Sequence, residues 1–166
     1  PLEVGSTVKG RIDWERRFDH MQQHSGGHLV MGRVYEKFGY HNVGFHMGED
    51  GIMTIDFNGE LEEEQLALIE KKANEAVRAN LPIICTFPDS QALAAMDYRS
   101  KLELTENVRI VEIEGIDRCA CCAPHVKRTG EIGIIEVVNF EKYKGGTRVS
   151  ILCGERALND IRHKLN

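Results

Sequence analysis

The chain has 166 residues, of which 42% are hydrophobic and 28% are charged, so it is long enough for one compact domain with its own core. It contains no apolar run of membrane-spanning length and opens with no signal-peptide pattern, so we expect no membrane association. The formal net charge of −5 argues against a protein that coats nucleic acid without specificity.

The cysteines indicate both a compartment and a use. There are five, an odd number, and three of them lie between Cys119 and Cys122, which makes a poor disulfide framework. This usage suits a reducing compartment, so we expect a cytoplasmic protein in which a thiolate binds metal. The chain begins at Pro1 rather than at a methionine, and we therefore expect further residues upstream.

The first expected elements are a short strand and a long helix. Residues 4–12 alternate in polarity and contain glycine, which predicts a strand. This strand has no partner in its own segment, so we interpret residues 1–12 as the remnant of an N-terminal β domain. The helical spacing of apolar residues then predicts a helix over 13–38, with Asp13 as its N-cap.

Strands and helices alternate along the rest of the chain. Residues 62–79 predict the clearest helix, since apolar residues line one face and acidic residues precede basic ones. The segment 115–130 is dense in cysteine and histidine and predicts a loop. The other expected elements are strands over 42–47, 52–57, 81–87, 108–114, 132–140 and 147–153, and helices over 90–96 and 155–165. This mixture predicts an α+β fold for residues 13–166, with an antiparallel or mixed sheet packed against helices.

Two residue pairs have the spacing of metal ligands. His24 and His28 are four residues apart in the long expected helix, which places both imidazoles on one face. Cys121 and His125 form a Cys-x-x-x-His pair in the expected loop. Together the two pairs make a plausible tetrahedral site, and three imidazoles with one thiolate suit zinc.

Several neighbouring residues leave alternatives open. Cys119 and Cys122 compete with Cys121 for the role of ligand, although each is also explained as a small buried residue. Gly26 and Gly27 each cost roughly 1 kcal/mol inside a helix. Either a substrate or strand approaches the helix backbone there, or the helix is locally distorted.

Three segments carry a resemblance to a known family. The run from Arg17 to Leu29, with Gln-Gln-His-Ser-Gly-Gly-His, resembles the His-x-x-x-His helix of alanyl-tRNA synthetase editing domains and of the free-standing alanyl-tRNA editing proteins called AlaX. Residues 121–133, Cys-Cys-Ala-Pro-His followed by Thr-Gly-Glu-Ile-Gly, resemble their second metal motif. Residues 43–48 and 54–57 resemble the strand pair in between.

The resemblance implies the α+β fold that these proteins share with threonyl-tRNA synthetase editing domains. It implies hydrolysis of the ester that joins serine or glycine to tRNA(Ala), with the acceptor end of that tRNA as partner. It makes zinc the cofactor and His24, His28, Cys121 and His125 its ligands. Gln22 and Gln23 would lie in the editing pocket, where Gln23 could orient water. Asn42 or His41 falls where relatives carry a threonine that contacts the seryl hydroxyl.

The expected reaction is attack of water on the aminoacyl carbonyl, with zinc either activating the water or holding the tRNA end. Four protein ligands usually mean a structural zinc site, whereas catalytic sites keep one position open. Two other functions therefore stay open. One is a zinc-containing module that binds tRNA without catalysis, and the other is a metallohydrolase for small esters or amides. A missing N-terminal domain could add contacts to the tRNA.

Overall fold

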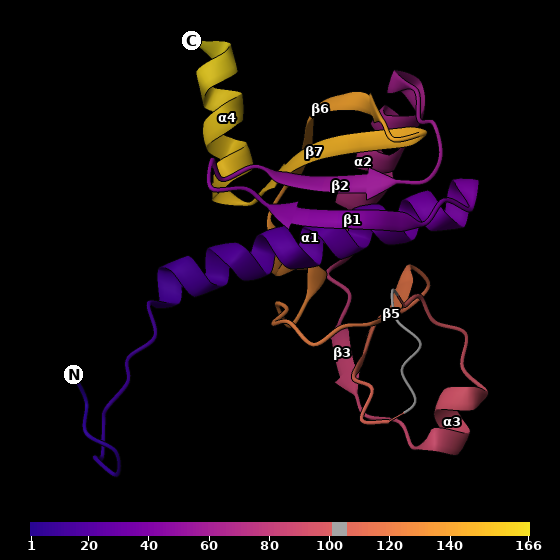
Figure 1. Cartoon of the computed structure of the whole chain (residues 1–166). Coiled ribbons are helices and arrows are strands. Elements are labelled where there is room, and N and C mark those ends of the chain that lie inside the picture. Colours follow the sequence, from indigo (N-terminus) through magenta and orange to yellow (C-terminus); the bar gives the residue numbers. More distant parts are fainter. Residues whose placement is uncertain (101–105) are drawn as a thin grey trace.

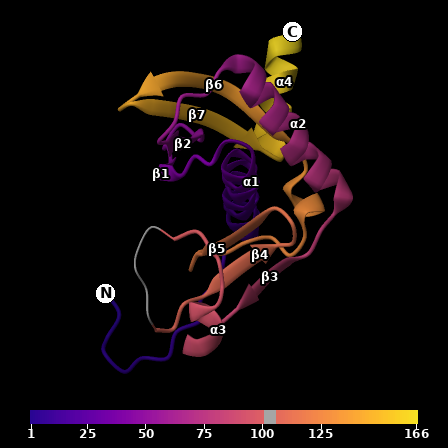
Figure 2. The ribbon, with the colours of Figure 1, turned by 90° about the vertical axis from the view of Figure 1, so that its right-hand side faces the viewer.

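A computed structural model describes residues 1–100 and 106–166. Within these ranges the fold is α+β, as the sequence predicts, with two antiparallel sheets on either side of helix α1 (Trp14–Phe38). Figure 1 shows α1 passing between the sheets, and Figure 2 shows the helix end-on, with the larger sheet above it and the smaller sheet below. Segments from both ends of the sequence therefore meet at α1.

Helix α1 begins and ends where its sequence requires. The Asp13 carboxylate accepts a hydrogen bond from the backbone N–H of Arg16, and Gly39 ends the helix in the left-handed conformation, with φ of 71°. An ordinary surface helix buries one stripe, but the middle of α1 is buried on nearly every side from Gln23 to Val34. This follows from its position between two sheets.

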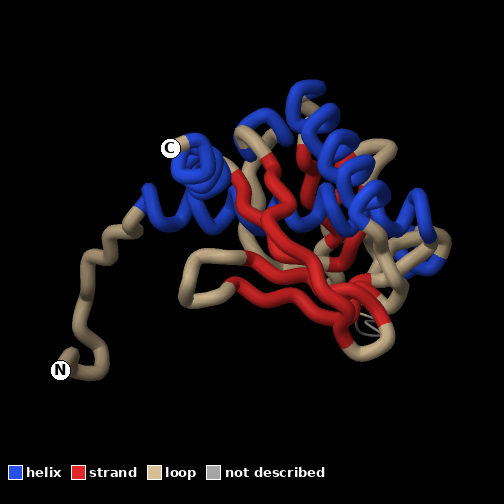
Figure 3. Tube along the Cα trace, turned by 90° about the horizontal axis from the view of Figure 1, so that it is seen from above, coloured by secondary structure: helices blue, strands red, loops and turns tan. Residues whose placement is uncertain are grey.

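The larger sheet contains strands β1 (Asn42–Met47), β2 (Met53–Phe57), β7 (Gly146–Cys153) and β6 (Ile135–Tyr143), in that spatial order. Its inner face buries alternate residues such as Ile55, Val149 and Ile151. Helices α2 (Glu63–Ala79) and α4 (Glu155–Leu165) lie with α1 on one side of the strands (Figure 3). The sheet and its helices thus enclose the main hydrophobic core.

The smaller sheet contains β3 (Ile83–Thr86), β4 (Ile110–Ile113) and β5 (Asp117–Ala120), in that order. Helix α3 (Ser90–Ala94) covers part of it through a separate small core of Leu93, Val108 and Ile110. The chain then runs through the segment 121–128 into a 3-10 turn, η1 (Thr129–Ile132), before entering β6. This return carries residues 121–128 back against α1.

Three expectations about local structure are wrong. Residues 4–12 form exposed irregular backbone, because no strand of the described residues supplies them with hydrogen-bonding partners. The expected loop 115–130 contains β5 and η1, because a turn with Gly115 at φ of 72° folds the chain back onto β4. The strand expected over 132–140 begins at Ile135, since η1 takes up the residues before it.

The glycine pair in α1 marks a close approach by strands. A Cβ at Gly26 would lie 2.3 Å from Cys153 Sγ, and one at Gly27 would lie 2.9 Å from the ring of Phe45. Helix α1 is continuous through both positions, so the alternative of local distortion is wrong. Separately, no helix in the described ranges is both long and apolar enough to cross a membrane.

Candidate metal centre

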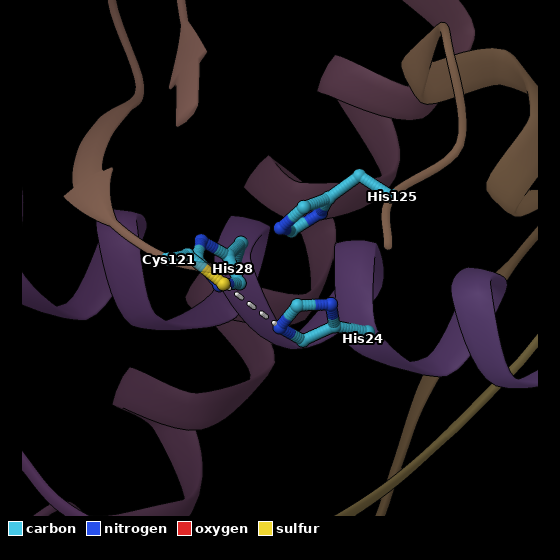
Figure 4. Close-up of side chains that lie close together, drawn as sticks. All are labelled: His24, His28, Cys121 and His125. Atoms are coloured by element: carbon cyan, nitrogen blue, oxygen red, sulfur yellow. Dashed lines mark hydrogen bonds between the residues drawn. The ribbon is translucent and has the colours of Figure 1, made fainter. Parts of the chain in front are cut away.

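Four side chains converge between α1 and the segment that follows β5. His24 and His28 project from consecutive turns of α1, and Cys121 and His125 come from the facing segment (Figure 4). Their ligand atoms all lie within 4.8 Å of one another. The two sequence pairs that suggested a metal site are therefore brought together in one cluster.

Each imidazole of the cluster is held by a contact at Nδ1. The partners are the Pro124 carbonyl oxygen for His24 (2.9 Å), Asp117 Oδ2 for His28 (3.0 Å) and Ser25 Oγ for His125 (3.0 Å). A carbonyl or a carboxylate oxygen can only accept, so Nδ1 of His24 and of His28 carries the proton. The Nε2 lone pair of both rings is then free to bind a metal, as in metal sites whose histidines donate from the other ring nitrogen.

The cluster fits zinc on two further observations. His125 Nε2 is buried and has no hydrogen-bond partner among the described residues, although buried polar atoms are normally satisfied. A bound metal would satisfy it. A tetrahedral zinc with usual bond lengths separates a nitrogen and a sulfur ligand by about 3.5 Å. Cys121 Sγ and His24 Nε2 are 3.4 Å apart.

The protonation states also suit a metal. Burial alone would raise the pKa of the Cys121 thiol, but the neighbouring imidazoles of His125, His24 and His28 outweigh burial and lower this pKa to about 3. Burial lowers the pKa of His125 to about 4. At neutral pH these two residues are therefore a thiolate and a neutral imidazole, which are the forms that bind zinc.

The position of each sulfur distinguishes the three neighbouring cysteines. Cys121 Sγ lies in the cluster, whereas Cys122 is exposed. Cys119 lies with His28 and Asp117 in a second group close enough to hold an ion. That group would use an Asp117 carboxylate that is already bound by His28 and by an arginine. The cluster containing Cys121 is therefore the better site.

The three residues expected to be catalytic lie outside the cluster. Gln23 is fully buried, and its side-chain amide bonds both the carbonyl oxygen and the N–H of Cys153, each at 2.8 Å. Gln22 Nε2 donates to the Glu131 carbonyl oxygen at 2.9 Å, and Asn42 Oδ1 accepts from Arg99 at 2.6 Å. Their catalytic roles stay predictions.

Sequence reasoning missed three residues beside the cluster. Ser25 and Asp117 hold two of the histidines, and the ring of Phe45 on β1 lies 5.8 Å from the ring of His24, between centroids. Phe45, rather than Asn42, is thus the β1 side chain that borders the cluster. Ser25 directly follows His24, a candidate ligand, and could have been noticed, but Asp117 is 89 residues from His28 and fell in an expected loop.

A cavity of about 360 Å³ lies next to the cluster rather than over it. Its lining includes Tyr35, His41 and Arg99, and Asp117 separates this cavity from His28. His41, the alternative to Asn42 for contact with a seryl hydroxyl, therefore faces this cavity.

Comparison with known proteins identifies the relatives of this chain. Residues 108–150 match the family model described as the threonyl and alanyl tRNA synthetase second additional domain. The chain is 33% identical over 171 residues to alanyl-tRNA editing protein Aarsd1-A of Xenopus laevis, which covers 100% of this chain and 41% of that protein. This chain is thus similar along its length to proteins named alanyl-tRNA editing proteins.

The chain is also similar to a second editing protein and to an alanine–tRNA ligase. Alanyl-tRNA editing protein AlaX-L of Pyrococcus horikoshii is 30% identical over 164 residues, which are 97% of this chain and 40% of the relative. Alanine–tRNA ligase of Ignicoccus hospitalis is 32% identical over 164 residues, 94% of this chain and 18% of the ligase. The chain thus spans about two fifths of the editing proteins that it matches.

Proposed function

We propose that this chain is a zinc-dependent editing domain that hydrolyses the aminoacyl ester of Ser-tRNA(Ala) or Gly-tRNA(Ala). The observation that carries the proposal is the cluster of His24, His28, Cys121 and His125, with its Nε2 and thiolate atoms turned toward one point. The cluster lies in a chain that is homologous to alanyl-tRNA editing proteins over its full length. Its substrate would be the acceptor end of tRNA(Ala).

Four residues would bind the metal, and the residues around them would hold and shape the site. The four ligands leave a formal charge of about +1 on a bound divalent ion, because only Cys121 is anionic. Zinc held there would supply Lewis acidity to an ester carbonyl or to water. Ser25, Asp117 and the Pro124 carbonyl keep the histidine rings in place. Phe45 forms an apolar wall next to His24.

We further propose that the editing domain comprises residues 13–166 and acts in the cytoplasm. Residues 1–12 are exposed, and the cap of α1 is supplied by Asp13, so the described contacts of the domain begin there. Five cysteines, an odd number with three of them between Cys119 and Cys122, suit a reducing compartment. Because the editing relatives are longer than this chain, a further domain could contact the tRNA beside it.

The test compares substrates that differ in one group. The chain is incubated with tRNA(Ala) charged with serine, glycine or alanine, and with a small aminoacyl ester. We expect Ser- or Gly-tRNA(Ala) to be hydrolysed at least about 100-fold faster than Ala-tRNA(Ala), because a pocket built around one ligand leaves groups unpaired with another. Binding of tRNA without hydrolysis would indicate the non-catalytic module instead. Equal turnover of the small ester would indicate a small-molecule hydrolase.

A further inference from the structure

A chain of hydrogen bonds runs from His28 away from the cluster. His28 Nδ1 lies 3.0 Å from Asp117 Oδ2, and Arg99 holds the same carboxylate with two bonds, from Nε to Oδ1 at 2.7 Å and from Nη2 to Oδ2 at 2.8 Å. The remaining terminal nitrogen, Nη1, donates to Asn42 Oδ1 at 2.6 Å. This chain reaches His28 alone among the three imidazoles.

The carboxylate in this chain is deeply buried. The side chain of Asp117 is only 2% exposed and that of Arg99 only 10%. A buried charge is tolerated only when it is paired and hydrogen-bonded, and the planar guanidinium pairs with both oxygens at once. Asp117 therefore has one fixed orientation, with Oδ2 turned toward His28.

Arg99 is itself fixed by the backbone. Its N–H donates to the Arg118 carbonyl at 2.8 Å, and its carbonyl accepts from the N–H of Ala120 at 2.9 Å, so it lies alongside β5 as an added parallel bridge. Asn42, at the far end of the chain, is the first residue of β1 in the larger sheet. Through this chain of bonds His28 is connected to both sheets. The Nδ1 partners of the other two imidazoles are local, because Pro124 and Ser25 directly adjoin His125 and His24 in sequence.

We propose that Asp117, oriented by Arg99, is a positioning residue that fixes His28 as a metal ligand. The carboxylate keeps the proton on Nδ1, turns Nε2 toward Cys121 and makes the imidazole a stronger donor to a cation. This inference rests on the proposed zinc site, but it concerns metal affinity and not the identity of the substrate. The inference gives a function to the Asp117–Arg99 ion pair, whose burial costs desolvation free energy.

The experiment measures zinc affinity on the whole chain by competition with a chromophoric chelator. Asp117→Ala should weaken zinc binding about 10- to 100-fold, as loss of such outer partners does in other sites. Asp117→Asn retains an oxygen for the Nδ1 proton but lacks the charge, so its loss should be intermediate. The matched control is Glu112→Ala, which removes the other carboxylate–arginine pair of the same hairpin, at 2.8 Å from Arg118, and should leave affinity within about twofold.

A purely structural role of Asp117 would lower the unfolding temperature of the zinc-free variants and leave the zinc affinity of the folded protein unchanged. That result in Asp117→Ala would overturn the inference. If Asp117→Ala does not fold, Asp117→Asn decides, and an affinity within about twofold of the unsubstituted chain overturns it. An unsubstituted chain that binds zinc but hydrolyses no charged tRNA(Ala) would contradict the proposed function and leave this inference standing.

Discussion

Some residues around the candidate metal centre take part in more than one hydrogen bond each. Ser25 Oγ accepts from the N–H of Val126 at 3.1 Å while it contacts His125 Nδ1 at 3.0 Å. One hydroxyl on α1 therefore holds both the backbone and the imidazole of the facing segment. Contacts of this kind restrict the imidazole to one orientation, which would reduce the ordering cost of metal binding.

The choice of thiolate can be tested at the residue scale. Cys121→Ala should lower zinc affinity by more than about 100-fold, since loss of a direct ligand exceeds the cost of losing an outer partner. Cys122→Ser changes the exposed neighbouring thiol and should have no effect. Chelator competition measures both. If Cys121→Ala retained its zinc affinity and Cys122→Ser lost it, Cys122 and not Cys121 would be the ligand.

A second residue-scale prediction concerns pH. Arg148 donates to both carboxylate oxygens of Asp56, at 2.6 and 2.8 Å, and these bonds lower the pKa of Asp56. A lowered folded-state pKa contributes stability above about pH 4, and this stability is lost as pH falls through the folded value. Asp56→Asn should therefore reduce the free energy of unfolding by about 1–2 kcal/mol at pH 7, with the difference shrinking below about pH 4.

Denaturant unfolding across this pH range measures the effect of Asp56→Asn. Glu141→Gln is the control, because Glu141 lies opposite Arg148 on the neighbouring strand but is exposed. It should change stability by less than about 0.5 kcal/mol. A loss in Asp56→Asn that is equally large at pH 3 would show that packing, and not charge, is responsible.

The sequence predicted the four residues of the cluster but not the contacts that hold them in place. The spacing of His24 and His28 on a helix, together with a Cys-x-x-x-His pair, is a local signal, and the family resemblance selected Cys121. Asp117 and Arg99 carry no such signal, because their contact with His28 depends on a hairpin that the sequence did not reveal. Long-range contacts of this kind follow from the fold and not from local pattern.

At the level of elements, α1 is unusual because strands approach its backbone where two glycines lie in sequence. Gly26→Ala would place a Cβ 2.3 Å from Cys153 Sγ, so we expect a loss of about 1–3 kcal/mol in the free energy of unfolding. At an exposed helix position the same change is stabilising by about 1 kcal/mol. A loss of stability in Gly26→Ala, rather than a gain, would therefore show that Cys153 lies close to the helix backbone.

A double-mutant cycle measured by denaturant unfolding provides the control for Gly26→Ala. In a Cys153→Ala background the sulfur is absent, and the nearest remaining contacts of the new Cβ are at 3.4 Å or more. Gly26→Ala should then be neutral or slightly stabilising. An equal loss in both backgrounds would mean that the sulfur is not the obstacle.

Helices with strong capping and periodicity were predicted well, as were most strands, but the short strand β5 was missed and residues 4–12 were wrongly expected to form one. The expected helices over 13–38 and 62–79 agree with α1 and α2 within one residue at each end. Strand β5, Asp-Arg-Cys-Ala, has no alternation of apolar residues, and it forms because β4 supplies a full set of backbone partners. Residues 4–12 do alternate in polarity but have no neighbouring strand among the described residues. In both cases the presence of a hydrogen-bonding partner strand, and not the alternation of apolar residues, decides whether a strand forms.

At the level of the whole molecule, the candidate centre lies where the two sheets meet α1. The candidate ligands come from the helix and from the segment that leaves the smaller sheet, and the larger sheet contributes Phe45 and Asn42. A metal at this junction would join parts of the chain that are about 100 residues apart in sequence. Metal binding should therefore stabilise the whole described domain and not one element.

The central claim is that metal held by this cluster is required for hydrolysis of mischarged tRNA(Ala). The most direct measurement is the rate of serine release from Ser-tRNA(Ala) by the whole chain, first as purified, then after removal of metal with a chelator, and then after one equivalent of zinc is restored. We expect the rate to fall to background without metal and to recover with zinc. Full activity in the metal-free protein, verified by elemental analysis, would contradict the account.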